Sequence, residues 1–245
     1  MSMFIDFILL FLFAGAPYFI FLERSKVLGK DNIFLLSAFF VICGVILSNI
    51  FPQTPSTAFV IIALLGSLFA LYKANKTNNL YKLAYYILFF NAPMLILFET
   101  KESTLYAISL LVTLLGIFLI AKYYERNYGS ANYQSVTGIT LVTPYAGLML
   151  TIYLTALALY PPFPNSLMFL NGILVAEINT IWYIAVIIVF FGNFLIAARI
   201  MAKTVFGKPN TNVHYIDLAP KERWLHLAIF IVLLVLSIFG LKELL

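Results

Sequence analysis

Long apolar stretches alternate with short polar segments along the whole chain. Eight of the stretches approach the roughly 20 residues that a helix needs to cross the hydrocarbon core of a bilayer. They cover residues 3–22, 32–51, 57–73, 80–98, 104–122, 139–160, 179–202 and 223–243. The pattern therefore predicts an all-α integral membrane protein in which residues 1–245 form a single transmembrane domain with about eight transmembrane helices.

A ninth apolar stretch, 162–176, is shorter and begins within a cluster of prolines. Pro161, Pro162 and Pro164 interrupt a helix, because proline has no backbone N–H and clashes with the preceding turn. We expect a short broken helix whose break faces inward, since irregular backbone at membrane depth must be covered by protein or water. Glu177 follows directly: it would line a polar path if 162–176 is re-entrant, and would otherwise be a loop acid.

The composition excludes a water-soluble domain. Among 245 residues there are 15 Lys and Arg and 10 Asp and Glu, 63% are hydrophobic, and the mean hydropathy is +1.00, whereas about a quarter of an average soluble chain is charged. Cys43 is the one cysteine, which excludes an internal disulfide framework. The sequence also lacks a phosphate loop, a spaced His or Cys set and a paired nucleophile, so we predict no catalytic, cofactor-binding or metal-binding residue in this chain.

Basic side chains gather on one side of the predicted bundle. If every helix crosses, that side carries Arg24, Lys26, Lys30, Lys73, Lys76, Lys82, Lys122 and Arg126. Such loop charge sets the orientation of a membrane protein, and we do not interpret it as a nucleic-acid signal. The loop 203–222 is ambiguous, because its side depends on whether 162–176 crosses.

Ionisable groups inside the predicted helices or at their ends are candidates for a proton path. Asp6 lies one turn into the first stretch, Lys73 and Lys82 lie at helix ends, and Glu177 lies beside the proline break. Arg199 is also inside a stretch. For all of these a structural role is the competing interpretation, since side chains close to an interface can reach water or headgroups.

Uncharged polar and aromatic residues predict how the helices pack. Asn91, Asn165, Asn171 and Asn193 are expected to form hydrogen bonds between helices, and His226 is expected at an interface. Aromatic residues near the predicted helix ends fit an interfacial belt: Tyr72, Tyr81, Tyr85, Tyr123, Tyr124, Trp182 and Trp224.

Four stretches, in order from about residue 55 onward, resemble a known family. They are FALYKANKTNNLYKLAYY at 69–86, YERNYGSANYQSVTGI at 124–139, TLVTPYAGLMLTIYLTALALYPP at 140–162, and AARIMAKTVFGKPN at 197–210 followed by DLAPKE at 217–222. Their order and spacing are similar to the later helices of the antiporter-like, proton-channel subunits of respiratory complex I, NADH:ubiquinone oxidoreductase. Subunit 4, the bacterial M-type chain, is most similar, and subunit 2 is next.

The resemblance implies the second half of an inverted-repeat fold. Residues 1–79 would be a remnant of the first repeat, 80–202 the second repeat, and 203–245 a loop and the final helix. The family's membrane lysine would fall within 38–46 and its carboxylate within 167–172, and neither segment contains a matching residue. The resemblance therefore implies the fold and the assembly without the family's proton-relay residues.

The function implied is that of a membrane-arm core subunit, or a fragment of a split subunit, that contributes to proton translocation coupled to electron transfer from NADH to quinone. The resemblance implies no cofactor in this chain, with NADH, FMN, iron–sulfur clusters and quinone in other subunits. It implies other membrane subunits as partners, including a separate chain that supplies the missing N-terminal helices. The mitochondrial inner membrane is the favoured location and a bacterial cytoplasmic membrane the alternative.

Two other functions compete with this one. The chain could be a degenerate, purely structural membrane-arm subunit, which would fit the scarcity of charge inside its helices. It could also be a subunit of a related cation/proton antiporter or membrane hydrogenase, although such transport requires membrane acids and lysines even more directly.

Overall fold

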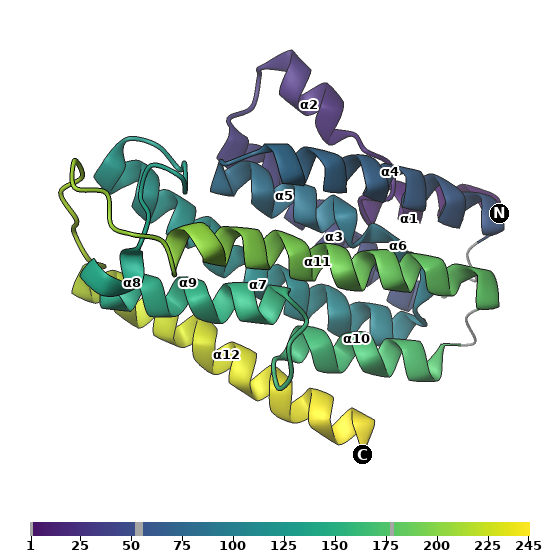
Figure 1. Cartoon of the computed structure of the whole chain (residues 1–245). Helices are drawn as coiled ribbons and strands as arrows, with labels where there is room; N and C mark the ends of the chain where they lie inside the picture. Colours follow the sequence, from purple (N-terminus) through teal and green to yellow (C-terminus); the bar gives the residue numbers. More distant parts are fainter. Residues whose placement is uncertain (1, 52–55, 177–178) are drawn as a thin grey trace.

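Every regular element is a helix in the part of the chain that the computed structural model describes, residues 2–51, 56–176 and 179–245 (Figure 1). In chain order the helices are α1 (Ser2–Leu12), α2 (Phe19–Ser25), α3 (Lys30–Ile50), α4 (Thr57–Lys76), α5 (Leu80–Phe90), α6 (Ala92–Leu97), α7 (Thr100–Tyr128), α8 (Ile139–Val142), α9 (Pro144–Leu157), α10 (Pro164–Val175), a 3₁₀ turn η1 (Thr180–Trp182), α11 (Tyr183–Thr204) and α12 (Pro220–Leu244). The longer helices pack side by side into one bundle.

In the described part of the chain, six helical segments are long and apolar enough to cross a membrane, which agrees with the predicted all-α membrane fold. They are Lys30–Ile50, Thr57–Lys76, Leu80–Leu97, Thr100–Tyr128, Thr180–Thr204 and Pro220–Leu244. Two of the eight expected crossings, 3–22 and 139–160, are instead divided into shorter helices.

Local backbone chemistry explains both divisions. In the first, α1 ends at Leu12, Ala14 adopts a left-handed conformation with φ of 58°, and Pro17 lacks the N–H that a continuing helix needs. In the second, Pro144 has the same effect, so that α8 ends at Val142 and α9 starts afresh. Hydropathy alone does not detect these turns, because the residues around them are as apolar as the helices.

The proline cluster separates α9 from α10. Helix α9 ends at Leu157, and α10 begins at Pro164 with Pro161 and Pro162 in the connection between them. Both of these prolines are exposed, so the expectation that the break faces inward is wrong within this chain. The two helices follow α7 in succession (Figure 1). The ring of Tyr153 in α9 lies against Gly116 in α7, and Asn165 in α10 accepts a hydrogen bond from Thr113, which is nearer the start of α7. Together, α9 and α10 run the length of the bundle as one discontinuous path.

The long loop before α12 consequently lies at the basic end of the bundle. Gly138 N donates to Lys203 O at 3.4 Å, and Thr137 Oγ1 donates to Lys208 O at 2.6 Å. The hydroxyl of Tyr123, near the end of α7, donates to Ile216 O at 2.5 Å. The ambiguity over loop 203–222 is thus resolved, and its lysines add to the basic end.

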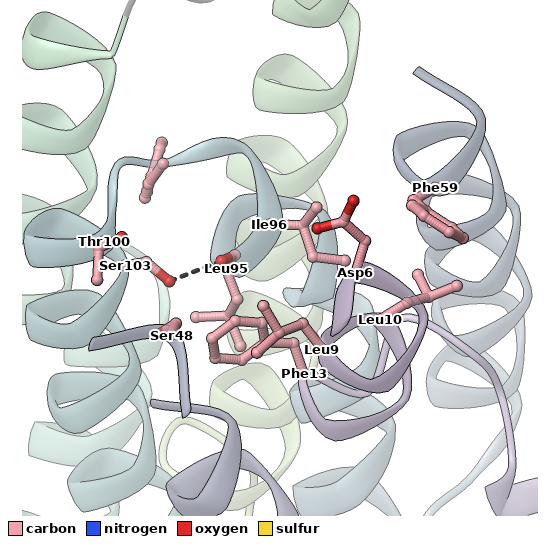
Figure 2. Close-up of a pocket in the computed structure, with 11 residues that line it drawn as sticks. Asp6, Leu9, Leu10, Phe13, Ser48, Phe59, Leu95, Ile96, Thr100 and Ser103 are labelled. Atoms are coloured by element: carbon pink, nitrogen blue, oxygen red, sulfur yellow. Dashed lines mark hydrogen bonds between the residues drawn. The ribbon is translucent and has the colours of Figure 1, made fainter. Parts of the chain in front are cut away.

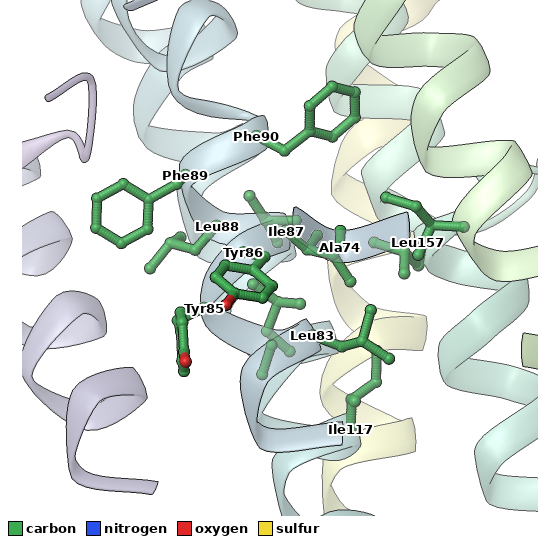
Figure 3. Close-up of a cluster of buried hydrophobic side chains, with 14 of the residues drawn as sticks. Ala74, Leu83, Tyr85, Tyr86, Ile87, Leu88, Phe89, Phe90, Ile117 and Leu157 are labelled. Carbon is green, nitrogen blue, oxygen red and sulfur yellow. The ribbon is translucent and has the colours of Figure 1, made fainter. Parts of the chain in front are cut away.

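Helix α5 is the centre of the bundle. Of the residues from Leu80 to Phe90, all are buried except Lys82, which is partly exposed. Figure 3 shows that the side chains of Tyr85, Phe89 and Phe90 point away from this helix in different directions. A helix that is apolar on all sides requires neighbours on all sides, and α3, α4 and α7 pack around it.

Several tyrosines assigned to an interfacial belt are core residues instead. Tyr81, Tyr85, Tyr123 and Tyr124 are 3% exposed or less, whereas Tyr72 and Trp224 are exposed as the belt requires. Trp182 is intermediate. The inward orientation arises because these hydroxyls find the acceptors that a buried tyrosine needs, on other helices for Tyr81 and Tyr85 and in loops for Tyr123 and Tyr124.

The predicted hydrogen bonds from asparagines between helices are confirmed for Asn91 and Asn193, at the junction of α5 and α6. Asn91 Nδ2 donates to Asn193 Oδ1 at 3.1 Å, and Asn193 Nδ2 donates to Asn91 Oδ1 at 2.7 Å. Tyr106 OH also donates to Asn91 Oδ1, at 2.6 Å. Asn165 accepts from Thr113 at 3.1 Å, and Asn171 is buried in α10. These bonds join α5, α7, α10 and α11 inside the bundle.

Arg199 has a structural role at the end of α4. Its guanidinium donates to the carbonyl oxygens of Ala74, Asn75 and Thr77, at 2.7 Å for Ala74 and 3.4 Å for Thr77. The last carbonyls of a helix have no partner within the helix, and a cation there is favourable. Arg199 therefore joins α11 to α4.

We expect the Arg199→Leu substitution to lower the free energy of unfolding by about 2 kcal/mol, because hydrogen bonds to a charged group contribute about 1.5–3 kcal/mol. Unfolding of the detergent-solubilised chain would be measured. Lys203→Leu is the matched control, since Lys203 is an exposed cation one turn later in α11 and should change stability by no more than about 0.5 kcal/mol. Equal effects of the two substitutions would contradict the capping role.

Candidate functional site

Glu23 is the centre of a charged cluster between α2 and α5. Its Oε1 accepts hydrogen bonds from Tyr85 OH at 2.6 Å and from Tyr86 OH at 2.5 Å. Lys82 Nζ lies 3.4 Å from the same oxygen. The side chains of Lys82 and Glu23 are 30% and 19% exposed, so this ion pair lies at the boundary between the core and solvent.

The local sequence of α5 and the turn before α2 explain why Glu23 contacts Lys82 and the two tyrosines. Lys82, Tyr85 and Tyr86 are three and four residues apart in α5, which brings them to one face of the helix. The turn after α1 leads into α2, whose Glu23 accepts the hydrogen bonds of Tyr85 and Tyr86 on this surface. The cluster therefore depends on the divided first helix.

The environment of Glu23 favours its ionised form. Burial would by itself raise the pKa of this carboxyl, but the hydrogen bonds from Tyr85 and Tyr86 and the positive charge of Lys82 outweigh burial, so the pKa of Glu23 lies below its ordinary value. A stable carboxylate here keeps its lysine partner fixed beside the two phenols.

Two recesses adjoin this cluster and share part of their walls. The first, of about 490 Å³, is lined by Glu23 and Lys82, and the second, of about 470 Å³, by Glu222 and His226. Asp31, Tyr81 and Glu125 line both of them. We call the two recesses together the charged recess.

Paired groups continue along the charged recess from α5 to α12. Tyr81 OH donates to Glu125 Oε2 at 2.8 Å. Arg126 and Glu222 form an ion pair at 2.6 Å. His226 Nδ1 lies 2.8 Å from the hydroxyl of Tyr153. Carboxylates, phenols, an imidazole and basic side chains thus lie at one end of the bundle, and those that line the recess can exchange hydrogen bonds with water there.

The predicted proton-path residues that the structure describes, Lys73, Lys82 and Asp6, do not come together. Lys82 belongs to the charged recess, whereas Lys73 lies in the last turn of α4 with its Nζ 5.6 Å from the centre of the Phe69 ring. Glu177 lies outside the described residues. Asp6, on α1, lines a cavity with Thr100 at the start of α7, whereas Lys82 lines a recess with Glu125 near the end of α7, so the two lie at opposite ends of the bundle.

Asp6 borders a small, mostly apolar cavity of about 40 Å³ (Figure 2). The carboxylate lies beside Ile96, while Ser48, Thr100 and Ser103 are on the other side of the cavity (Figure 2). Ser103 is already bonded to Leu95 O at 2.6 Å. Asp6 Oδ1 is buried and has no hydrogen-bond partner among the described residues. These groups do not converge on one point, so the cavity is a weaker candidate than the charged recess.

Neither part of the candidate site forms a metal centre. Among the described residues, no group of three or more His, Cys, Asp or Glu side chains could hold a metal ion. The arrangement fits proton exchange and ion pairing, which need titratable groups and water only.

Sequence reasoning missed most of the charged recess. Glu23, Glu125 and Glu222 are not among the candidates that the sequence pattern indicates, and His226, expected at an interface, is 2% exposed. The spacing of Lys82, Tyr85 and Tyr86 was a visible signal of a polar helix face. Their partner, Glu23, could be found only by recognising the turn around Pro17.

Comparisons with known proteins identify a similar fold but no family and no curated relative. No family model matches the chain, and no curated protein matches it. Among solved structures, a chain of respiratory complex I from Thermus thermophilus with bound NADH has a similar fold, with a TM-score of 0.66 and 17% sequence identity. The match covers 83% of this chain and 46% of that chain, so the present chain spans less than half the length of the one it resembles.

Proposed function

We propose that this protein is a membrane-arm subunit of a complex I-type NADH:quinone oxidoreductase. The single observation that carries the proposal is the structural similarity to a chain of respiratory complex I over 83% of the present chain. The four family-like stretches noted in the sequence support the same assignment and favour a subunit 4-like position.

Within such an assembly, the charged recess is the feature of this chain that best supports a part in proton translocation. Lys82 and Glu23 form an ion pair of limited exposure beside two phenols, so protonation of Glu23 would release Lys82. Glu125, Glu222 and His226 extend the titratable groups towards α12. We propose that this recess exchanges protons with water on the basic side of the membrane.

A purely structural role is the second candidate. The observation that favours it is the neutral centre of the bundle, where Asn91, Asn193 and Tyr106 are bonded to one another and titratable groups lie mainly towards the ends. A scaffold needs packing and specific contacts between helices, which such neutral networks supply.

Partners are proposed on the outer face of α3. Phe39, Ile42 and Ile46 are 58%, 48% and 57% exposed along this helix, and either lipid or another apolar helix would cover them. We propose neighbouring membrane subunits there, in particular a separate chain that supplies further N-terminal helices. The mitochondrial inner membrane is the proposed location, and a bacterial cytoplasmic membrane the alternative.

Purification of the tagged chain in mild detergent tests the assembly. We expect co-purification with subunits that oxidise NADH and reduce quinone, together with a second small membrane chain that cross-links to residues 30–50. A monomeric chain without NADH-oxidising partners would overturn the proposal.

Proton pumping by the purified assembly in vesicles distinguishes translocation from scaffolding. We expect Lys82→Gln to lower proton uptake several-fold relative to NADH oxidation, because Glu23 loses its cationic partner. Lys101→Gln is the matched control, since Lys101 belongs to an exposed ion pair with Glu243, which contributes little. Unchanged pumping in an intact Lys82→Gln assembly would favour the structural role.

A further inference from the structure

A groove outside the charged recess lies between the first turns of α9 and α12. It has a volume of about 340 Å³ and is lined by Tyr145, Met149, Leu218, Arg223, Trp224 and Leu227 among others. Both helices begin at the same end of the bundle (Figure 1). The groove therefore starts at the basic end and runs inward along both helices.

Polar and apolar side chains are separated along this groove. Tyr145 and Trp224 are in the first turns of their helices and are 46% and 72% exposed. Met149 and Leu227 follow four and three residues later, which is about 5–6 Å deeper along a helix. The groove thus has an aromatic, water-facing rim and an apolar floor, as expected at the boundary between headgroups and hydrocarbon.

Arg223 is held at the rim with part of its guanidinium unused. Its Nε donates to Leu218 O at 2.8 Å, and the guanidinium carbon lies 3.8 Å from the centre of the Tyr145 ring. Among the described residues, neither terminal nitrogen of Arg223 has a hydrogen-bond or ion-pair partner. A planar arginine fixed in this way is suited to binding a phosphate oxygen pair.

The acids near Arg223 already have partners. Glu222 pairs with Arg126 at 2.6 Å. The Asp217 carboxylate accepts from the backbone N–H groups of Tyr145, Ala146 and Leu218 at 3.3, 3.1 and 2.8 Å. The adjacent Lys221 is exposed and adds positive charge. Arg223 is therefore a cation without an acidic partner among the described residues, at the depth where lipid headgroups would lie.

We propose that this groove binds an anionic phospholipid. The phosphate lies against Arg223 between Tyr145 and Trp224, and an acyl chain follows Met149 and Leu227 into the membrane. Charge complementarity selects the anionic headgroup, and the apolar floor selects a lipid over a soluble anion. The proposal requires only that α9 and α12 lie in a bilayer, so it is independent of the proposed enzyme assembly.

Tryptophan quenching by brominated lipids tests this site in the full chain. The sequence has two tryptophans, and Trp182→Phe leaves Trp224 as the reporter. The chain is reconstituted in phosphatidylcholine vesicles that contain a minor, equal fraction of brominated phosphatidylglycerol or brominated phosphatidylcholine. We expect stronger quenching by the anionic lipid, and a decrease of this preference at high salt, which screens exposed charges.

Substitutions at the rim and far from it complete the experiment. Arg223→Gln should lower the preference for the anionic lipid about fivefold, the factor that one basic residue near an anionic surface contributes, and Arg223→Lys should retain part of it. Lys242→Gln, at the opposite end of α12, should leave it unchanged. The proposal is overturned if the two lipids quench equally, or if the preference for the anionic lipid survives Arg223→Gln or high salt. It is also overturned if added inorganic phosphate abolishes this preference at matched ionic strength, because the site would then bind a soluble anion.

Discussion

We expect the Glu23→Leu substitution to lower the free energy of unfolding by about 3 kcal/mol. It removes the acceptor of the hydroxyls of Tyr85 and Tyr86, which are 0% and 2% exposed as residues, together with the partner of Lys82. A buried donor left without an acceptor costs about 1–3 kcal/mol, whereas the partly exposed lysine can turn towards water. Unfolding in detergent would be followed by circular dichroism and by thermal aggregation.

Glu243→Leu is the matched control for Glu23→Leu. Glu243 is also a carboxylate in an ion pair, with Lys101, but the side chains in this pair are 32% and 63% exposed. Exposed pairs contribute about 0–1 kcal/mol. A loss of stability for Glu23→Leu no larger than that for Glu243→Leu would contradict the central position of Glu23 in the charged recess.

The effect of pH on Glu23 provides a second measurement. Because the pKa of Glu23 is lower in the folded chain than in the unfolded chain, the carboxylate stabilises the fold fully above the unfolded-state pKa and loses this contribution as the pH falls through the folded-state pKa. The difference in stability between the unsubstituted protein and Glu23→Leu should therefore shrink on acidification. A difference that stays constant down to strongly acidic pH would show that Glu23 acts through packing alone.

The fold was largely predictable because a bilayer restricts the chain strongly. A membrane leaves helices as the simplest way to satisfy the backbone, so hydropathy located the segments that became α3, α4, α7, α11 and α12. The prolines at 161–164 located the separation of α9 from α10. Hydropathy could not locate the turn around Ala14, since a break within an apolar segment leaves no change in composition.

The charged recess was much less predictable, because its contacts join distant parts of the sequence. Glu23 directly follows the first predicted helix and Tyr85 lies in the fourth, and their contact depends on the direction that α2 takes after the turn. His226 was expected at an interface and is instead enclosed beside Tyr153. A single helix reveals which residues share a face, but the neighbour of that face is a property of the whole bundle.

The second large effect is expected for Gly116→Ala in α7. A Cβ atom at this position would lie 2.6 Å from Cε1 and from Cζ of the Tyr153 ring, well inside van der Waals contact. Tyr153 is 0% exposed and its hydroxyl contacts His226 in α12, so the ring cannot move without disturbing a third helix. Adding up the overpacking, about 1–3 kcal/mol, and a weakened hydrogen bond, about 1 kcal/mol, we expect a loss of about 3 kcal/mol.

Gly44→Ala is the graded control for Gly116→Ala, because its Cβ would lie 3.1 Å from atoms of Leu12 and Phe13 and small shifts would relieve the contact. A double-mutant cycle then assigns the cause: in a Tyr153→Ala background the ring is gone, so Gly116→Ala should lose most of its effect. Two results would contradict this explanation: equal losses of stability for Gly44→Ala and Gly116→Ala, or an undiminished effect of Gly116→Ala in the Tyr153→Ala background. Either would mean that α7 and α9 can approach closely even when residue 116 has a Cβ atom. If instead the effect disappears with the ring, the glycine is what allows Tyr153 to reach His226 and to join α7, α9 and α12 at the charged recess.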